Sequence, residues 1–419
     1  MVQKLLANNC AKFSKFLVEK LNLGKGSALP GRVALTLDPK YLRKYNAELQ
    51  EGDYGFFISG TNGKTTSSGL LASIIESASG SAPVNNAFGA NLYYGIASEL
   101  VNSSSCLGAL NSQNFVFEVD EAALRQVAKD LSPKTVLLTN IFRDQLDRFG
   151  EIDATQKLLV EGLEVIESKS PINLVLNAND KKIAQIKEQI DLRKFTPFMY
   201  GVENIEIAFK ESSVEVDYSD IFSAKLLERK AGGSLIELNY KDQSIEIYLP
   251  IAGDFNIYNA CAAAAAAYIS GISFANIKKG IESYKGAFGR GEKKLVNGKE
   301  VNVFLIKNPA GATEVINFIS QFPKSKVLIA INDNYADGRD VSWLWDAVFE
   351  NLDKNISYVC SGTRAADMAL RLKYAGIENI TVDNDLILAI EKLAFITEKD
   401  ENLFVLPTYT ALLEINSKL

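Results

Sequence analysis

One short stretch, residues 60–66 with the sequence Gly-Thr-Asn-Gly-Lys-Thr-Thr, constrains this chain most. It follows an apolar run at 54–59 and precedes a helix-like run at 66–76. A strand, a glycine turn, Lys-Thr and a helix in this order predict a phosphate-binding loop, because the glycines let backbone N–H groups approach phosphate oxygens. The long form of the motif would have a further glycine where Ile58 stands, so only the short form is present. A glycine-rich turn without a ligand is the alternative, and the Lys-Thr-Thr run favours a nucleotide.

Two side chains of this loop have expected roles. Lys64 can reach the outer phosphates of a nucleotide, and the Thr65 hydroxyl can hold Mg²⁺. Glu118 ends a second strand candidate at 115–119 and is expected to be a further metal ligand, with a solvated strand end as the alternative. The predicted nucleotide-binding residues of the loop are Gly60, Thr61, Asn62, Gly63, Lys64, Thr65 and Thr66.

Composition limits the possible functions. The chain has 419 residues, 47% of them hydrophobic and 23% charged, which is typical of a globular protein of two or three domains. Its net charge of −6 argues against nucleic-acid binding. No apolar run is long enough to span a bilayer and no signal peptide is evident, so a cytoplasmic location is expected. Four widely spaced cysteines, Cys10, Cys106, Cys261 and Cys360, suit a reducing compartment.

The chain contains no histidine. This excludes every mechanism in which this chain itself supplies an imidazole base or metal ligand. Acid–base or metal chemistry must therefore use carboxylates, lysines, hydroxyls or a partner protein.

The order of elements predicts an α/β protein. Residues 2–21 form a basic amphipathic helix, which either packs on the next domain or contacts an anionic membrane surface. From 54 to about 182 strands and helices alternate, which predicts a mostly parallel sheet with ligands at the carboxyl ends of its strands. Residues 234–249 form a β-hairpin, and residues 256–268 form an alanine-rich buried helix.

A second, Rossmann-like α/β domain follows Arg290. Its predicted helices lie at 314–322, 342–352, 365–373 and 386–395. We therefore expect three parts: an N-terminal helix and lead-in (1–45), a central ATP-binding domain with the hairpin insertion (46–290), and a C-terminal α/β domain (291–419).

A polar stretch at 139–150, Thr-Asn-Ile-Phe-Arg-Asp-Gln-Leu-Asp-Arg-Phe-Gly, follows a buried strand. With the loop and Glu118 it resembles the Mur ligase superfamily, whose members activate a carboxylate with ATP as an acyl phosphate that an amine then attacks. The stretches 143–148, 306–311, 332–343 and 406–410 resemble the MurT family in particular, and the similarity runs from 29 to 413. In that family a synthetase subunit and a glutaminase, GatD, amidate D-glutamate in the stem peptide of lipid II.

The resemblance implies ATP and Mg²⁺ as cofactors. Asn256 matches an asparagine near the adenine, and Arg290 matches an arginine that contacts the terminal phosphate. Gln145 stands where typical Mur ligases carry a histidine, a difference that bears on a second metal site. The C-terminal Asp-x-x-His pattern of typical Mur ligases is replaced around 307–309. The resemblance therefore makes ammonia, not an amino acid, the expected nucleophile. Many family members carry a four-cysteine zinc ribbon; here no cysteine lies between Cys106 and Cys261, so no structural zinc is expected.

A glutaminase needs a Cys–His pair with an orienting acid, so this histidine-free chain is not the glutaminase. The resemblance implies a heterodimer with a GatD-like subunit, in which an aspartate of 332–340 faces the partner's Cys–His pair. Asp333, Asp337 and Asp340 are the candidates, and acidic turn residues capping a helix at Ser342 are the alternative.

The predicted function is ATP-dependent amidation of a lipid-linked peptidoglycan precursor at the inner face of the membrane. Two other functions remain open: a ligase that joins an amino acid to a carboxylate, as in folate or cyanophycin-like chemistry, and a nucleotide-gated scaffold without chemistry.

Overall fold

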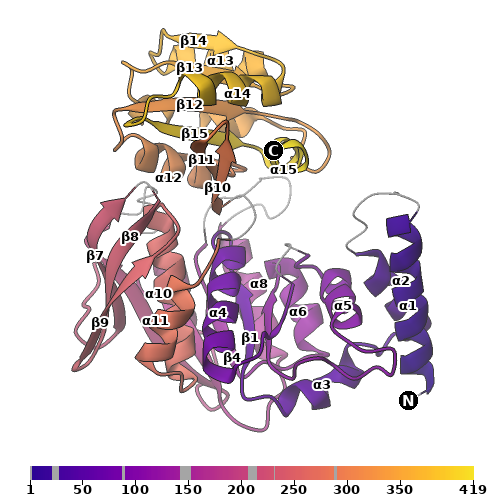
Figure 1. Cartoon of the computed structure of the whole chain (residues 1–419). Coiled ribbons are helices and arrows are strands. Elements are labelled where there is room, and N and C mark those ends of the chain that lie inside the picture. Colours follow the sequence, from indigo (N-terminus) through magenta and orange to yellow (C-terminus); the bar gives the residue numbers. More distant parts are fainter. Residues whose placement is uncertain are drawn as a thin grey trace.

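The computed structural model describes residues 2–20, 28–86, 90–141, 152–205, 215–230, 232–286 and 290–419. Two β-sheets organise these residues, and helices cover them (Figure 1). Both sheets are mostly parallel, so the predicted α/β class is confirmed. The predicted boundaries at 45 and 290 stay a prediction.

The first sheet has nine strands in the order β2-β3-β1-β4-β5-β6-β7-β8-β9. Its strands are parallel from β2 to β7, and the last two pairs, β7–β8 and β8–β9, are antiparallel. The bounds are β1 Gly55–Ser59, β2 Val84–Asn85, β3 Phe115–Glu118, β4 Thr135–Leu138, β5 Ile172–Asn177, β6 Phe195–Glu203, β7 Phe222–Lys230, β8 Gly233–Tyr240 and β9 Gln243–Leu249. The predicted hairpin is β8–β9.

Alternate side chains of the central strand β1 pack into the hydrophobic cores on the two faces of this sheet. Phe57 packs in the core on one face, whereas Phe56 and Ile58 pack in the core on the other. A strand buried on both faces reads as a continuous apolar run, which is what 54–58 shows. The helices around this sheet are α4 Lys64–Ser79, α5 Tyr93–Asn102, α6 Glu121–Ala128, α8 Ile152–Glu164, α9 Lys181–Ala184, α10 Asp254–Ile269 and α11 Phe274–Glu282.

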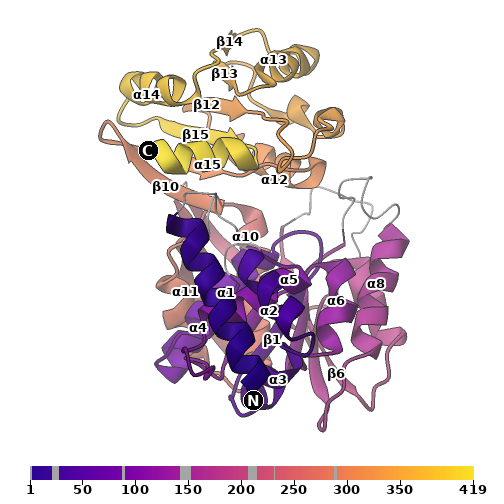
Figure 2. The same ribbon diagram turned by 90° about the vertical axis from the view of Figure 1, so that its right-hand side faces the viewer.

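Three helices precede the first sheet. They are α1 Val2–Lys20, α2 Leu29–Leu37 and α3 Arg43–Gln50. Helix α1 packs on α2 and α5, as one of the two sequence alternatives expected, and Figure 2 shows it lying across the outside of them. Within the described ranges, no helix has the length and apolar character needed to cross a membrane.

The second sheet has six strands in the order β10-β11-β15-β12-β13-β14, and only β10–β11 is antiparallel. It stacks on one end of the first sheet, where Phe255 at the start of α10 packs into its core (Figures 1 and 2). The bounds are β10 Arg290–Val296, β11 Lys299–Phe304, β12 Ser325–Ala330, β13 Tyr358–Ser361, β14 Ile380–Val382, β15 Asn402–Pro407, α12 Pro309–Ile319, α13 Ala365–Tyr374, α14 Leu386–Ile396 and α15 Tyr409–Lys418.

The helix predicted over 342–352 is wrong. Two short 3₁₀ turns, Ser342–Trp345 and Phe349–Asn351, stand there instead. Val348 between them leaves the helical region (φ −86°, ψ 70°), and its N–H donates to Thr313 Oγ1 of α12 at 3.1 Å. A tertiary hydrogen bond thus replaces the helical one.

Candidate active site

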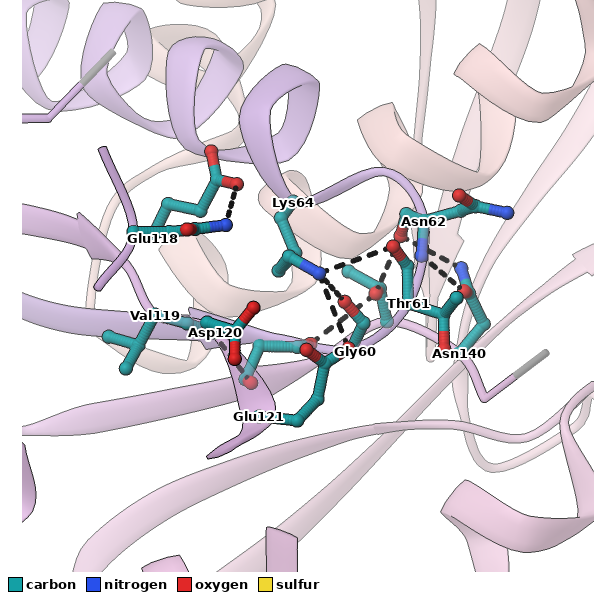
Figure 3. Close-up of polar contacts among 12 residues, drawn as sticks. Gly60, Thr61, Asn62, Lys64, Glu118, Val119, Asp120, Glu121 and Asn140 are labelled. Atoms are coloured by element: carbon teal, nitrogen blue, oxygen red, sulfur yellow. Dashed lines mark hydrogen bonds and ion pairs between the residues drawn. The ribbon is translucent and has the colours of Figure 1, made fainter. Parts of the chain in front are cut away.

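The glycine loop lies at the carboxyl end of the central strand, between β1 and α4 (Figure 3). Gly60 has φ +124° and Gly63 has φ +84°, values that L side chains rarely adopt. A Cβ on Gly63 would lie 2.1 Å from Asn259 Oδ1, and one on Gly60 would lie 2.4 Å from Thr139 Oγ1. Both positions therefore require glycine, and Gly63, at the N-cap of α4, brings the helix N-terminus to the loop.

Lys64 is buried, and its ammonium folds back over the loop (Figure 3). It donates to the carbonyl oxygen of Gly60 and, at 3.2 Å, to that of Thr61. It also forms an ion pair with Glu121 at 3.3 Å. Burial raises the pKa of the Glu121 carboxyl, and Lys64 partly offsets this. The loop thus holds a positive charge whose acceptors a phosphate group can replace.

Glu118 and Thr65 meet as the sequence predicted. Thr65 Oγ1 donates to Glu118 Oε2 at 2.6 Å. Asn91 Nδ2 donates to Glu118 Oε1 at 3.1 Å. Asn86 accepts from the Glu118 N–H and donates to its carbonyl oxygen, both at 2.8 Å, so the end of β3 is fixed. The carboxylate is therefore aimed at the Thr65 hydroxyl.

This donor set fits Mg²⁺, which prefers hard oxygen ligands and completes its shell with phosphates and water. Among the described residues there is no cluster of three His, Cys, Asp or Glu side chains. The metal-ligand roles of Thr65 and Glu118 stay predictions.

The start of the polar stretch 139–150 forms hydrogen bonds with the glycine loop. Asn140 accepts from the N–H groups of Thr61 (2.9 Å) and Asn62 (2.8 Å), and its Nδ2 donates to the Asn62 carbonyl oxygen at 3.0 Å. The Ile141 N–H donates to Asp180 Oδ2 at 2.7 Å, and burial raises the pKa of Asp180 to about 6. Residues 142–151, Gln145 among them, lie outside the described residues.

A cavity of about 1050 Å³, partly open to solvent, lies between the loop and the second sheet's domain. Asn308 at the N-cap of α12 donates to Asn62 Oδ1 at 3.3 Å across this space. From the first side the lining includes Asn62, Gly63, Thr66, Asn140, Tyr200, Phe255, Tyr258 and Asn259; from the second side it includes Leu305, Lys307, Asn308, Gly311 and Glu314.

Asn256 and Arg290 are not placed beside the loop by described side-chain contacts. Asn256 is fully buried, donates to the Ala252 carbonyl oxygen at 2.7 Å and accepts from Asn259 Nδ2 at 3.0 Å. Asn259, one helical turn further, lines the cavity instead. Arg290 begins β10, and only its backbone is described. Their predicted contacts with the nucleotide stay predictions.

The three aspartates lie together in the loop that follows β12. Asp333 accepts from Arg364 Nε and from Thr363 Oγ1, each at 2.8 Å, and these hydrogen bonds lower its pKa. Asp337 accepts from Thr410 Oγ1 at 2.6 Å and from the Thr410 N–H at 2.7 Å.

Asp340 accepts from the Ser342 N–H at 2.8 Å, as an acidic turn residue does, and hydrogen bonds from Ser342 lower its pKa. Of the three, Asp337 lines a second hollow of about 570 Å³, with Ala336, Trp343, Thr408 and Tyr409. Leu305 and Lys307 line both this hollow and the cavity beside the glycine loop. The two spaces therefore share a wall.

Sequence reasoning missed several of these groups. Glu121 pairs with Lys64, whereas its neighbour Asp120 is the N-cap of α6 and accepts from the Ala122 N–H at 3.1 Å. Asn86, Asn91 and Asn259 carried no motif of their own, although Asn259 lies one turn from Asn256.

Comparison with known proteins agrees with this geometry. The Mur ligase middle domain matches residues 58–267, and the MurT ligase C-terminal domain matches residues 305–412. A Staphylococcus aureus (strain COL) protein named lipid II isoglutaminyl synthase (glutamine-hydrolyzing) subunit MurT is 34% identical over 88% of this chain and 87% of its own length. The chain belongs to the MurT family. The Streptococcus pneumoniae R6 member is 32% identical over 97% of this chain and 94% of its own.

Solved structures outside the MurT family share the fold. MurF from Acinetobacter baumannii superimposes with a TM-score of 0.70 at 20% identity, over 92% of this chain and 81% of that one. MurF from Thermotoga maritima in complex with ADP gives a TM-score of 0.64 at 14% identity, over 92% and 84%. The MurT-like chain thus has the Mur ligase fold.

Proposed function

We propose that this chain is the synthetase subunit of a lipid II isoglutaminyl synthase. It uses ATP to convert the α-carboxylate of D-glutamate in the lipid II stem peptide to an acyl phosphate, and ammonia converts that to D-isoglutamine. The names of its relatives support this substrate and product. The observation that carries the chemistry is the buried Lys64 beside the Thr65–Glu118 pair, between Gly63 and Thr66, which line a cavity that both domains share.

The first step joins two anions. A carboxylate oxygen of the substrate bonds to the γ-phosphorus of ATP, and the bond from that phosphorus to the ADP oxygen breaks. Lys64 and the N-terminus of α4 supply positive potential where the charges meet. Thr65 and Glu118 would hold Mg²⁺, which when bound offsets phosphate charge.

The second step needs little from the protein. The ammonia nitrogen bonds to the acyl carbon, the carbon–oxygen bond to phosphate breaks, and the phosphate takes up the proton that nitrogen loses. Because phosphate is a good leaving group, no imidazole base is required, in keeping with a chain without histidine.

The ammonia comes from a glutaminase partner in this proposal. The relatives' names call them subunits of a glutamine-hydrolysing enzyme, and this chain has no histidine for a Cys–His pair. A GatD-like glutaminase docked on the exposed loop of Asp333, Asp337 and Asp340 would release ammonia beside the second hollow. Leu305 and Lys307 line both spaces, so the two hollows are neighbours and ammonia released at the second would have a short distance to travel.

The proposal is tested with the full chain, ATP, Mg²⁺, lipid II and ammonium salt, and then with glutamine and the partner in place of ammonium. Mass spectrometry should show conversion of acid to amide in both cases. Lys64→Met should slow conversion about a hundredfold or more, whereas Lys129→Met, at the exposed end of α6, should not. ADP release with an amino acid but not with ammonia would instead indicate an amino-acid ligase. Partner binding without any product would indicate a scaffold.

A further inference from the structure

Helix α1 carries its larger apolar side chains on the outside. Val2 is 80% exposed, Leu6 58%, Phe13 60% and Phe16 53%. Their spacing puts them on one face of the helix, and the rings of Phe13 and Phe16 stack with centroids 6.5 Å apart. A contiguous exposed apolar face of this kind marks an interaction site.

The inner face of α1 is small and polar instead. Ala7, Asn8 and Ala11 are fully buried against the protein. Asn8 Oδ1 accepts from Tyr41 Oη and Ser104 Oγ, both at 2.8 Å, and Asn8 Nδ2 donates to the Ser105 carbonyl oxygen at 2.9 Å. This buried network fixes which way the helix faces. The phenylalanines therefore point outward because the polar face is the one bound to the fold.

The same part of the chain is strongly basic. Residues 1–44 contain nine Lys and Arg and two Asp and Glu, a net charge of +7. The chain totals are 45 and 51, so the remaining residues carry 36 and 49, a net charge of −13. Figure 1 shows α1 and α2 side by side at one flank of the molecule, with α3 along the bottom of the first sheet. Lys20 of α1, Arg32 of α2 and Arg43 of α3 are exposed.

We propose that the outer face of α1 docks on an anionic lipid bilayer. An apolar face for the interface between headgroups and acyl chains, with cations for the headgroups, is the chemistry that a peripheral amphipathic helix needs. A second copy of this chain is a poor occupant, because pairing two such faces would bring like charges together. The inference rests on the proposed function for its purpose, since a lipid-linked substrate lies at such a surface.

The placement of the helix agrees with this role. Figures 1 and 2 show the N-terminus of α1 away from the second sheet and its other end toward it. The glycine loop and Glu118 lie at that end of the first sheet, at the carboxyl ends of β1 and β3. A docked α1 would hold the edge of the cavity near the membrane surface.

The test is co-sedimentation of the full chain, alone and with its glutaminase partner, with vesicles. Binding is expected to vesicles of equal parts phosphatidylglycerol and phosphatidylcholine, to fall with added salt, and to be weak for phosphatidylcholine alone. Phe13→Gln/Phe16→Gln should weaken binding at least about tenfold, because Gln keeps the helix but removes the apolar rings. Phe395→Gln on α14, where the ring is 84% exposed, is the matched control and should change binding less than about twofold.

Equal binding by the double variant and the wild type would overturn the inference. So would an absence of binding to anionic vesicles, or a concentration-dependent dimer in light scattering that the double variant abolishes. Amidation of a substrate analogue without the lipid tail separates this result from the proposed function. If the double variant and wild type amidate that analogue equally, loss of vesicle binding concerns docking alone; if neither does, the proposed function fails whatever the vesicles show.

Discussion

The carboxylates beside the glycine loop and those in the loop after β12 have pKa values shifted in opposite directions. Beside the glycine loop, burial raises the pKa of Glu121 and of Asp180. In the loop after β12, hydrogen bonds lower the pKa of Asp333 and of Asp340, which are close to solvent. In the first region the carboxylates are buried and already paired within the protein, as preorganised groups around a small charged ligand should be. The second presents ionised carboxylates outward, which suits recognition by another protein.

The largest effect is expected from the first region. Lys64→Met removes the buried ammonium and leaves Glu121 without its partner. Amide formation with ammonium as nitrogen source should fall about a hundred- to a thousandfold in kcat. Steady-state assays of ADP release would measure this. A loss below tenfold would mean that Lys64 does not face the reacting phosphate.

Substitutions in the loop after β12 should lower glutamine hydrolysis by the complex and leave ammonium-driven amidation nearly unchanged. Asp333→Asn, Asp337→Asn and Asp340→Asn keep the shape of each side chain and remove its charge. We expect one of them to lower glutamine hydrolysis by the complex about a hundredfold or more, by analogy with triads whose orienting acid is replaced. Amidation driven by ammonium salt should stay within about twofold, because the synthetase site is unchanged. Equal losses in both assays would remove the functional distinction between the two loops.

A smaller effect tests the tight packing of the glycine loop. Gly63→Ala puts a Cβ on Asn259 at a positive φ, and should lower stability by about 1–3 kcal/mol and weaken nucleotide binding. Gly80→Ala is the matched control, because Gly80 also has positive φ (+76°) but a Cβ there would meet open space. Chemical denaturation and calorimetric titration with ATP would measure both. Similar losses for the two variants would mean that backbone strain, not the contact with Asn259, sets the requirement.

The smallest effect concerns pH. The raised pKa of Asp180, about 6, means that the native state keeps a proton which the unfolded state has lost, so its contribution favours the native state less as pH rises from about 4 to 6. Asp333 has a lowered pKa, so its contribution is lost as pH falls toward that value. Denaturation curves of Asp180→Asn and Asp333→Asn across pH 3–7 should therefore differ from wild type with opposite slopes. If both variants changed the pH dependence of stability in the same direction, the contrast between the two regions would be wrong.

The sequence predicted those parts of the fold and site that local chemistry determines. The glycine loop, Glu118 beside Thr65 and the buried helix α10 follow from short motifs and from apolar runs. The helix expected at 342–352 failed because a contact with Thr313 competes with the helical hydrogen bond, and a single sequence does not show that contact.

The other misses have the same origin. Asn91 and Asn259 reach the site only through the packing of distant elements, and neither carries a pattern that sets it apart from a surface amide. The Glu121–Lys64 pair was hidden because a glutamate that starts a helix has a simpler explanation as a cap.

The wall shared by the two hollows has a consequence for how this enzyme can change. Leu305 and Lys307 belong to both spaces. Under the proposed function, a substitution at either position would alter both the cavity beside the glycine loop and the hollow where ammonia is proposed to be released, so selection could not tune one half-reaction there without affecting the other. A new acceptor specificity would have to arise at residues that line only one of the two hollows, such as Glu314 in the first or Tyr409 in the second.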